Sequence, residues 1–147
     1  MTAPSTTPHA YVINLAKATE RMAHMQSELD RIQIEFTRIE AVLGDQLSDP
    51  IKDFDEKRFN RLTGKHRNKR EIGCYFSHIR ALKAFLETSA EHALILEDNI
   101  NLPDTLPALL AEAIKHSAHW DLLRLTSSRK GRFIKIAPLN DTYQLAY

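Results

Sequence analysis

The feature that most constrains the fold is a short apolar run that ends in three polar residues. Residues 93–96, Ala-Leu-Ile-Leu, are followed at once by Glu97, Asp98 and Asn99. An uninterrupted apolar run of this length is typical of a strand buried on both faces, as in a parallel sheet. In open α/β sheets, ligands bind beyond the carboxyl ends of the strands. We therefore expect a sheet that carries these three polar residues at this edge.

Two interpretations of these three polar residues stay open. Carboxylate and amide oxygens are the ligands that Mg²⁺ and Mn²⁺ prefer, and such an ion is commonly shared with the phosphates of a nucleotide. The same three residues can also form a simple turn with a helix cap.

Strands and helices alternate along the whole chain. Helices are expected at residues 19–31, 51–63 and 71–88 and in the segment after Thr105. In these segments apolar residues recur at helical spacing or a helix-capping residue precedes the segment. Strands are expected at residues 11–15, 36–42, 93–96, 120–125, 132–136 and 142–147. This order predicts an α/β domain with a mainly parallel central sheet. We expect a disordered segment at residues 1–10 and a single domain over residues 11–147.

The composition indicates one ordinary globular domain. The 147 residues are 43% hydrophobic and 27% charged, with a formal net charge of +1, so charge gives no pull toward nucleic acid. Cys74 is the only cysteine, which excludes an intrachain disulfide and favours a reducing compartment. Residues 1–10 do not resemble a secretory signal, and no apolar run approaches the roughly 20 residues that cross a bilayer. We expect a cytoplasmic protein, with docking on a membrane surface left open.

Three features of the middle of the chain each allow a structural and a functional interpretation. The basic run at residues 65–70 is either a solvated loop or an electropositive lip for a diphosphate or an anionic acceptor. Small residues such as Gly73 and Ser77 line one face of the helix at 71–88, which favours either tight packing or room for a ligand. His78, at the edge of the apolar stripe, is either a hydrogen-bonded structural residue or a catalytic one.

Signatures of other nucleotide-dependent enzymes are missing from the sequence. The chain has only four glycines and no glycine-rich phosphate loop, which argues against P-loop and dinucleotide-binding folds. Metal-dependent phosphoryl transfer is therefore the weaker interpretation of the acidic cluster.

Three segments together resemble the bacterial glycosyltransferases of family 25, the lipooligosaccharide biosynthesis type. They are residues 12–15 with Glu20-Arg21 shortly after, residues 71–78 and residues 93–98, and residues 120–123 add a further block. The resemblance covers the chain from Tyr11 onward. It implies a GT-A-like α/β fold that transfers a hexose, typically galactose, from a UDP-sugar. The acceptor would be a lipooligosaccharide or another lipid-linked or surface glycan, met at the cytoplasmic face of the inner membrane.

The resemblance also implies the residues of a site. The donor-binding residues would be Asn14, Arg21, Ser77, His78, Glu97 and Asp98. A Mn²⁺ or Mg²⁺ ion would bridge the acidic motif and the donor diphosphate, with Asp98 and Asn99 as the metal ligands. No catalytic base is assigned within this chain.

Two departures from the family pattern keep a rival function open. The family generally has Glu-Asp-Asp where this chain ends in Asn99, and an amide brings no negative charge, so metal affinity should fall. The chain also ends at Tyr147, inside an expected strand, whereas family members continue. We expect either an unusually short product or a C-terminally incomplete fragment. The rival is a non-catalytic sugar-nucleotide-binding or interaction module derived from this fold.

Overall fold

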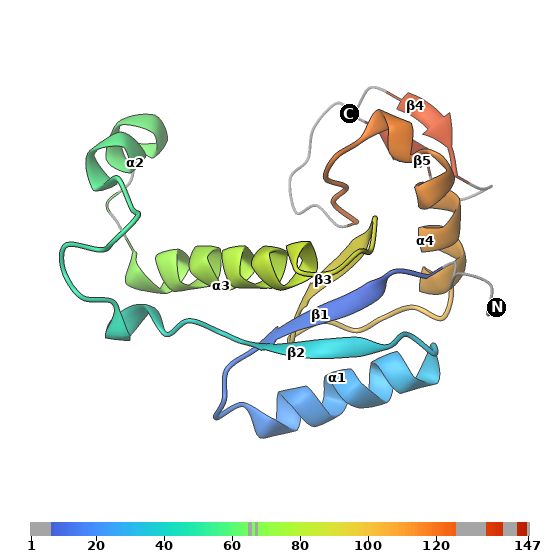
Figure 1. The fold of residues 1–147 in the computed structure, drawn as a ribbon, viewed down its shortest axis with the longest axis horizontal. Coiled ribbons are helices and arrows are strands. Elements are labelled where there is room, and N and C mark those ends of the chain that lie inside the picture. The colour runs from blue at the N-terminus through green and yellow to red at the C-terminus, as the bar shows by residue number, and fades with distance from the viewer. Residues whose placement is uncertain (1–6, 65, 67, 126–134, 140–143, 147) are drawn as a thin grey trace. The chain divides into compact units, whose positions relative to one another are not determined.

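The computed structural model describes residues 7–64, 66, 68–125, 135–139 and 144–146 (Figure 1). The chain divides into two compact units, one of residues 9–101 and one of residues 102–147 together with residues 1–8. None of the described helices is long and apolar enough to cross a membrane. The two units are taken in turn.

The first unit contains a three-stranded sheet whose strands all run parallel. β1 (His9–Asn14) lies between β2 (Phe36–Glu40) and β3 (Ala93–Glu97). Ile13 pairs with Ile39 on one side and with Glu97 on the other, so the three strands end at the same edge. The predicted α/β class and the parallel pairing are confirmed here, and the residues that follow β3 are brought next to the end of β1.

Two helices cover opposite faces of this sheet (Figure 1). Tyr11 and Ile13 of β1 pack with Ala81 of α3 (Lys69–Leu86) on one face. Because side chains alternate along a strand, Val12 points to the other face, where α1 (Thr19–Arg31) lies. Met25 of α1 and Val12 are fully buried. The bounds of α1 are those that its periodicity predicts.

The segment between β2 and α3 is less regular. α2 (Glu56–Thr63) is shorter than the predicted helix; Asp55 caps it by accepting a hydrogen bond from the backbone N–H of Arg58. α3 begins at Lys69, two residues earlier than predicted, because Asn68 accepts from the N–H of Arg70 and so caps it. The end of the basic run is therefore part of a helix. Residues 65 and 67 of that run lie outside the described residues.

The space beside Gly73 is filled by the chain itself. A Cβ on Gly73 would lie 2.7 Å from the backbone nitrogen of Gly44 and 2.7 Å from the carbonyl oxygen of Val42. Gly44 begins the short 3₁₀ helix η1 (Gly44–Gln46). The hydroxyl of Ser77 accepts from the N–H of Val42 at 2.8 Å and donates to the carbonyl of Gly73 at 2.7 Å. Tight packing, and not room for a ligand, explains these small residues.

The described residues of the second unit form an α-helix, a short 3₁₀ helix and a small antiparallel sheet. α4 (Leu106–Lys115) buries Leu106, Leu110 and Ala113 as its apolar pattern predicts. The same pattern also predicts burial of Leu109 and Ile114, which are half-buried. α4 is followed by η2 (Ser117–His119). β4 (Lys135–Pro138) and β5 (Gln144–Ala146) pair with each other and overlap two predicted strands. Residues 132–134, 142–143 and 147 of those predicted strands lie outside the described residues.

The predicted strand at residues 120–125 is wrong. No strand in the described part of the chain pairs with it, and Leu122 is 73% exposed. Trp120 instead donates its indole N–H to the carbonyl of Ala113 at 3.2 Å, and Leu123 packs in the same small cluster. An apolar run without a hydrogen-bonding neighbour does not form a strand, because its backbone groups would stay unpaired.

Candidate functional site

Four polar side chains meet where β1 and β3 end, and we call Asn14, Arg21, Arg38 and Asp98 the polar cluster. Asn14 is the last residue of β1, Asp98 follows β3, Arg21 comes from the first turn of α1 and Arg38 from β2. Asn14 is 2% exposed and Asp98 is 7% exposed. The cluster therefore has a buried centre at the edge where open α/β sheets bind ligands.

Asn14 holds the polar cluster together through three hydrogen bonds. Its amide nitrogen donates to Asp98 Oδ2 at 2.6 Å and to the carbonyl of Ala18 at 3.0 Å. Its amide oxygen accepts from Arg38 Nε at 2.9 Å. A buried amide with its polar atoms paired in this way fixes the positions of its neighbours.

The carboxylate of Asp98 has a partner at each oxygen. Oδ2 accepts from Asn14, and Oδ1 lies 3.0 Å from Arg21 Nη1 in an ion pair. The Arg21 side chain is 47% exposed, and Arg38 is exposed as well. The buried Asp98–Asn14 pair thus positions two arginine head groups that remain accessible to a ligand from solvent.

The expected Mn²⁺ or Mg²⁺ ion does not fit at Asp98 in this arrangement. Both carboxylate oxygens are engaged, and an ion bound there would lie next to the guanidinium of Arg21. Asn99, the other expected ligand, is exposed in the turn that follows β3. Metal ligation by Asp98 and Asn99 stays a prediction that requires Arg21 to move away.

A second group of side chains gathers around Glu97, the residue before Asp98. We call Cys74, His78 and Glu97 the Cys74–His78–Glu97 cluster. Glu97 Oε1 accepts from Cys74 Sγ at 3.6 Å and lies 3.1 Å from His78 Nε2. Cys74 is exposed as a residue, but partial desolvation of its thiol raises the pKa, and the negative charge and the hydrogen bond of Glu97 raise that pKa further. The thiol is therefore protonated at neutral pH, as its donation to Glu97 requires.

The structure thus sorts the residues that the resemblance assigned to donor binding. Asn14, Arg21 and Asp98 come together, and His78 lies with Glu97. Ser77 is 1% exposed with its hydroxyl engaged in the backbone contacts described above; its contact with a donor stays a prediction.

Two residues that share these clusters were missed from the sequence. Arg38 is a single arginine in a strand of alternating pattern, and only its place next to β1 brings it to Asn14. Cys74 precedes His78 by one helical turn, which is the sole sequence signal that could have linked the two.

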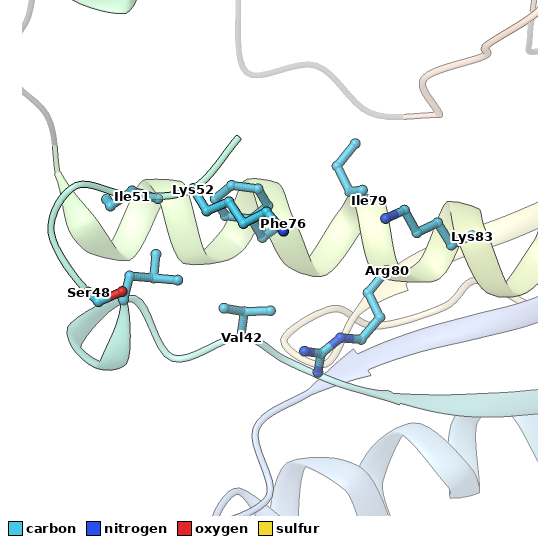
Figure 2. A pocket seen from close by; sticks show the side chains of 9 residues that line it. Val42, Ser48, Ile51, Lys52, Phe76, Ile79, Arg80 and Lys83 are labelled. Carbon is cyan, nitrogen blue, oxygen red and sulfur yellow. The ribbon is translucent and has the colours of Figure 1, made fainter. Parts of the chain in front are cut away.

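A separate groove of about 350 Å³ lies between α3 and the segment that follows β2 (Figure 2). Its apolar lining includes Val42, Ile51 and Phe76, and its cationic side chains are Lys52, Arg80 and Lys83. No member of the polar cluster lines it. Because residues on a helix advance about 100° each, Phe76 and Cys74 lie on roughly opposite sides of α3. The groove is therefore distinct from both clusters.

Comparison with known proteins identifies the family. The model of glycosyltransferase family 25, described as an LPS biosynthesis protein family, matches residues 7–142. The chain belongs to glycosyltransferase family 25. The match includes both clusters and the whole parallel sheet.

Individual relatives in animals are similar over most of this chain. A glycosyltransferase 25 family member of Anopheles gambiae is 32% identical over 125 residues, covering 78% of this chain and 21% of that protein. The procollagen galactosyltransferase 1-B of Xenopus laevis is 27% identical, covering 81% and 21%. The inactive glycosyltransferase 25 family member 3 of Mus musculus is 26% identical, covering 78% and 21%. The chain thus spans about a fifth of the length of these relatives.

Proposed function

We propose that this chain binds the sugar-nucleotide donor of a family 25 glycosyltransferase, with the polar cluster as the diphosphate site. The observation that supports this most is the pair of exposed arginines held by buried Asn14 and Asp98 at the carboxyl ends of β1 and β3. The family match to residues 7–142 covers all of these residues.

Arginine is suited to this task for a physical reason. A guanidinium carries five N–H donors in a planar fork that matches two phosphate oxygens. One nitrogen of Arg21 contacts Asp98 and one nitrogen of Arg38 contacts Asn14, which leaves further donors on each side chain. Because negative charge grows on the diphosphate as the sugar departs, prepositioned cations lower the barrier. A bound divalent ion would supply further charge neutralisation.

The finer parts of the proposal follow the resemblance. The proposed donor is a UDP-hexose, with galactose favoured. The proposed transfer uses Mn²⁺ or Mg²⁺, which Asp98 and Asn99 would hold once Arg21 has moved away. The acceptor is a lipooligosaccharide or another surface or lipid-linked glycan, reached on the cytoplasmic side of the inner membrane. The name of the Xenopus relative also specifies galactose transfer. The α/β fold of the chain is proposed to be of the GT-A type.

Titration of the full chain with UDP tests the diphosphate site. Arg21→Gln and Arg38→Gln should each raise the Kd for UDP about tenfold or more, since a hydrogen bond to a charged group contributes about 1.5–3 kcal/mol. Arg31→Gln is the matched control, because Arg31 lies at the far end of α1 and pairs with Glu28 on the surface. Unchanged UDP affinity in both folded variants would place the nucleotide elsewhere.

The rival proposal is a non-catalytic module that keeps the donor site. The mouse relative named as inactive and the neutral Asn99 favour it. Release of UDP from UDP-galactose, followed over time with Mn²⁺ present, separates the two. Binding together with release supports the transferase, and binding without release supports the module.

A further inference from the structure

The Cys74–His78–Glu97 cluster has the donor atoms of a metal site that the family assignment does not describe. A thiol, an imidazole and a carboxylate each offer one ligand atom, and these three atoms lie within 4.8 Å of one another. It is the one such group of histidine, cysteine and acidic side chains within the described parts of the chain. All three residues belong to the first compact unit.

The spacing of the three atoms is close to that of a tetrahedral zinc site. With bonds of about 2.0–2.3 Å, neighbouring ligand atoms in such a site are about 3.3–3.8 Å apart. The structure has Cys74 Sγ at 3.6 Å and His78 Nε2 at 3.1 Å from the same oxygen of Glu97. The third pair, Cys74 Sγ and His78 Nε2, lies within 4.8 Å.

Two rigid elements hold these donors. Cys74 and His78 are four residues apart on α3, so both point to the same side of the helix. Glu97 is the last residue of β3, and α3 packs on the sheet that contains β3. Cys74 is exposed, and the side chains of His78 and Glu97 are 40% and 46% exposed, so an ion can enter from solvent.

We propose that Cys74, His78 and Glu97 bind a thiophilic divalent cation, with Zn²⁺ as the reference ion. Sulfur and imidazole ligands select zinc or cobalt over magnesium and manganese, which prefer oxygen ligands alone. Three protein ligands leave the fourth tetrahedral position to water or to an incoming ligand. This site is separate from the diphosphate site proposed above and does not depend on sugar-nucleotide binding.

The binding reaction balances with the loss of one proton. The Cys74 thiol that donates to Glu97 gives its proton to the buffer and forms the metal–sulfur bond. His78 would bind the ion through Nε2, with the one proton of the bound ring on Nδ1. Glu97 Oε1 would exchange its contacts with Cys74 and His78 for the bond to the metal.

Direct binding to the reduced full chain tests this proposal. Zn²⁺ should bind with one ion per chain and raise the Tm, because it binds the folded state across two elements. Co²⁺ should give a thiolate-to-metal charge-transfer absorption. Cys74→Ser should abolish that absorption. His78→Gln and Glu97→Gln should each weaken Zn²⁺ binding by about tenfold or more, because losing a residue that only hydrogen-bonds to a metal ligand already costs about tenfold.

The matched control is His24→Gln, because His24 is an exposed histidine of the same unit that contacts Asn101 and none of the proposed ligands. This variant should bind Zn²⁺ as the unmodified chain does. Far-UV circular dichroism and the urea midpoint establish that each variant is folded. If Cys74→Ser does not fold, then His78→Gln and Glu97→Gln decide the outcome.

Three results would overturn the cation site. The first is no saturable Zn²⁺ or Co²⁺ binding to the reduced chain. The second is binding that the ligand variants leave as strong as His24→Gln does. The third is displacement of Zn²⁺ by Mg²⁺ at a comparable concentration, which would indicate a site of oxygen ligands.

Discussion

Replacement of Asp98 by asparagine measures how much the buried carboxylate stabilises the fold. The substitution keeps the size of the side chain but gives it a single acceptor oxygen. In the native chain, Oδ2 accepts from Asn14 at 2.6 Å and Oδ1 pairs with Arg21 at 3.0 Å. The introduced amide can satisfy only one of these donors and presents its own N–H group to the other. Asp98→Asn should therefore destabilise the protein without any metal present.

The size of the effect follows from the two contacts. A hydrogen bond to a charged group contributes about 1.5–3 kcal/mol when it is buried. The ion pair adds less, about 0–1 kcal/mol, because nearly half of the Arg21 side chain is exposed. We expect the free energy of unfolding to fall by about 2 kcal/mol, which corresponds to a drop of about 5–10 °C in Tm for a chain of this size.

Urea denaturation in EDTA, followed by circular dichroism, provides the measurement. Asp30→Asn is the control, because Asp30 is an exposed carboxylate on α1 and its loss should change stability by less than about 0.5 kcal/mol. Equal stability of Asp98→Asn and the unmodified chain in EDTA would refute the anchoring role. If the variant instead lost only a stabilisation that Mn²⁺ confers, Asp98 would be a metal ligand.

Two further substitutions test the packing and the electrostatics around α3. Gly73→Ala should destabilise the chain by about 1–3 kcal/mol in urea titrations, because the new Cβ would lie 2.7 Å from backbone atoms of Val42 and Gly44. Helix propensity alone predicts the opposite sign, about 1 kcal/mol of stabilisation, so a more stable variant would rule out the close approach. Glu97→Gln should lower the raised pKa of the Cys74 thiol, because the carboxylate charge is one of its causes. Iodoacetamide should then alkylate Cys74 faster near pH 8 in EDTA, and equal rates for both folded chains would show that Glu97 does not act on the thiol.

Several local features could be predicted from the sequence because neighbouring residues determine them. The apolar spacing of residues 19–31 defines α1, and the short apolar run at 93–96 defines a strand of a parallel sheet. The same reasoning failed at residues 120–125. There the pattern of a strand is present, but no partner strand among the described residues pairs with it. Whether an apolar run becomes a strand depends on its neighbours in space as well as on its own residues.

The site itself depended on contacts between residues that are far apart in the chain. Asn14 and Asp98 are 84 positions apart, and the parallel pairing of β1 with β3 is what brings them together. Arg38 reaches Asn14 only because β2 lies on the other side of β1. No local spacing contains this information, because register and strand order follow from the packing of the whole sheet.

The sequence by itself determined that a polar group follows a buried strand and that the chain resembles family 25. Only the tertiary structure decided how the adjacent carboxylates divide their roles. Asp98 turns inward to Asn14 and Arg21, whereas Glu97 faces Cys74 and His78 on α3. The physical reason is that consecutive residues at a strand end point to different sides, and what each side chain meets there is set by the helices and strands packed around it.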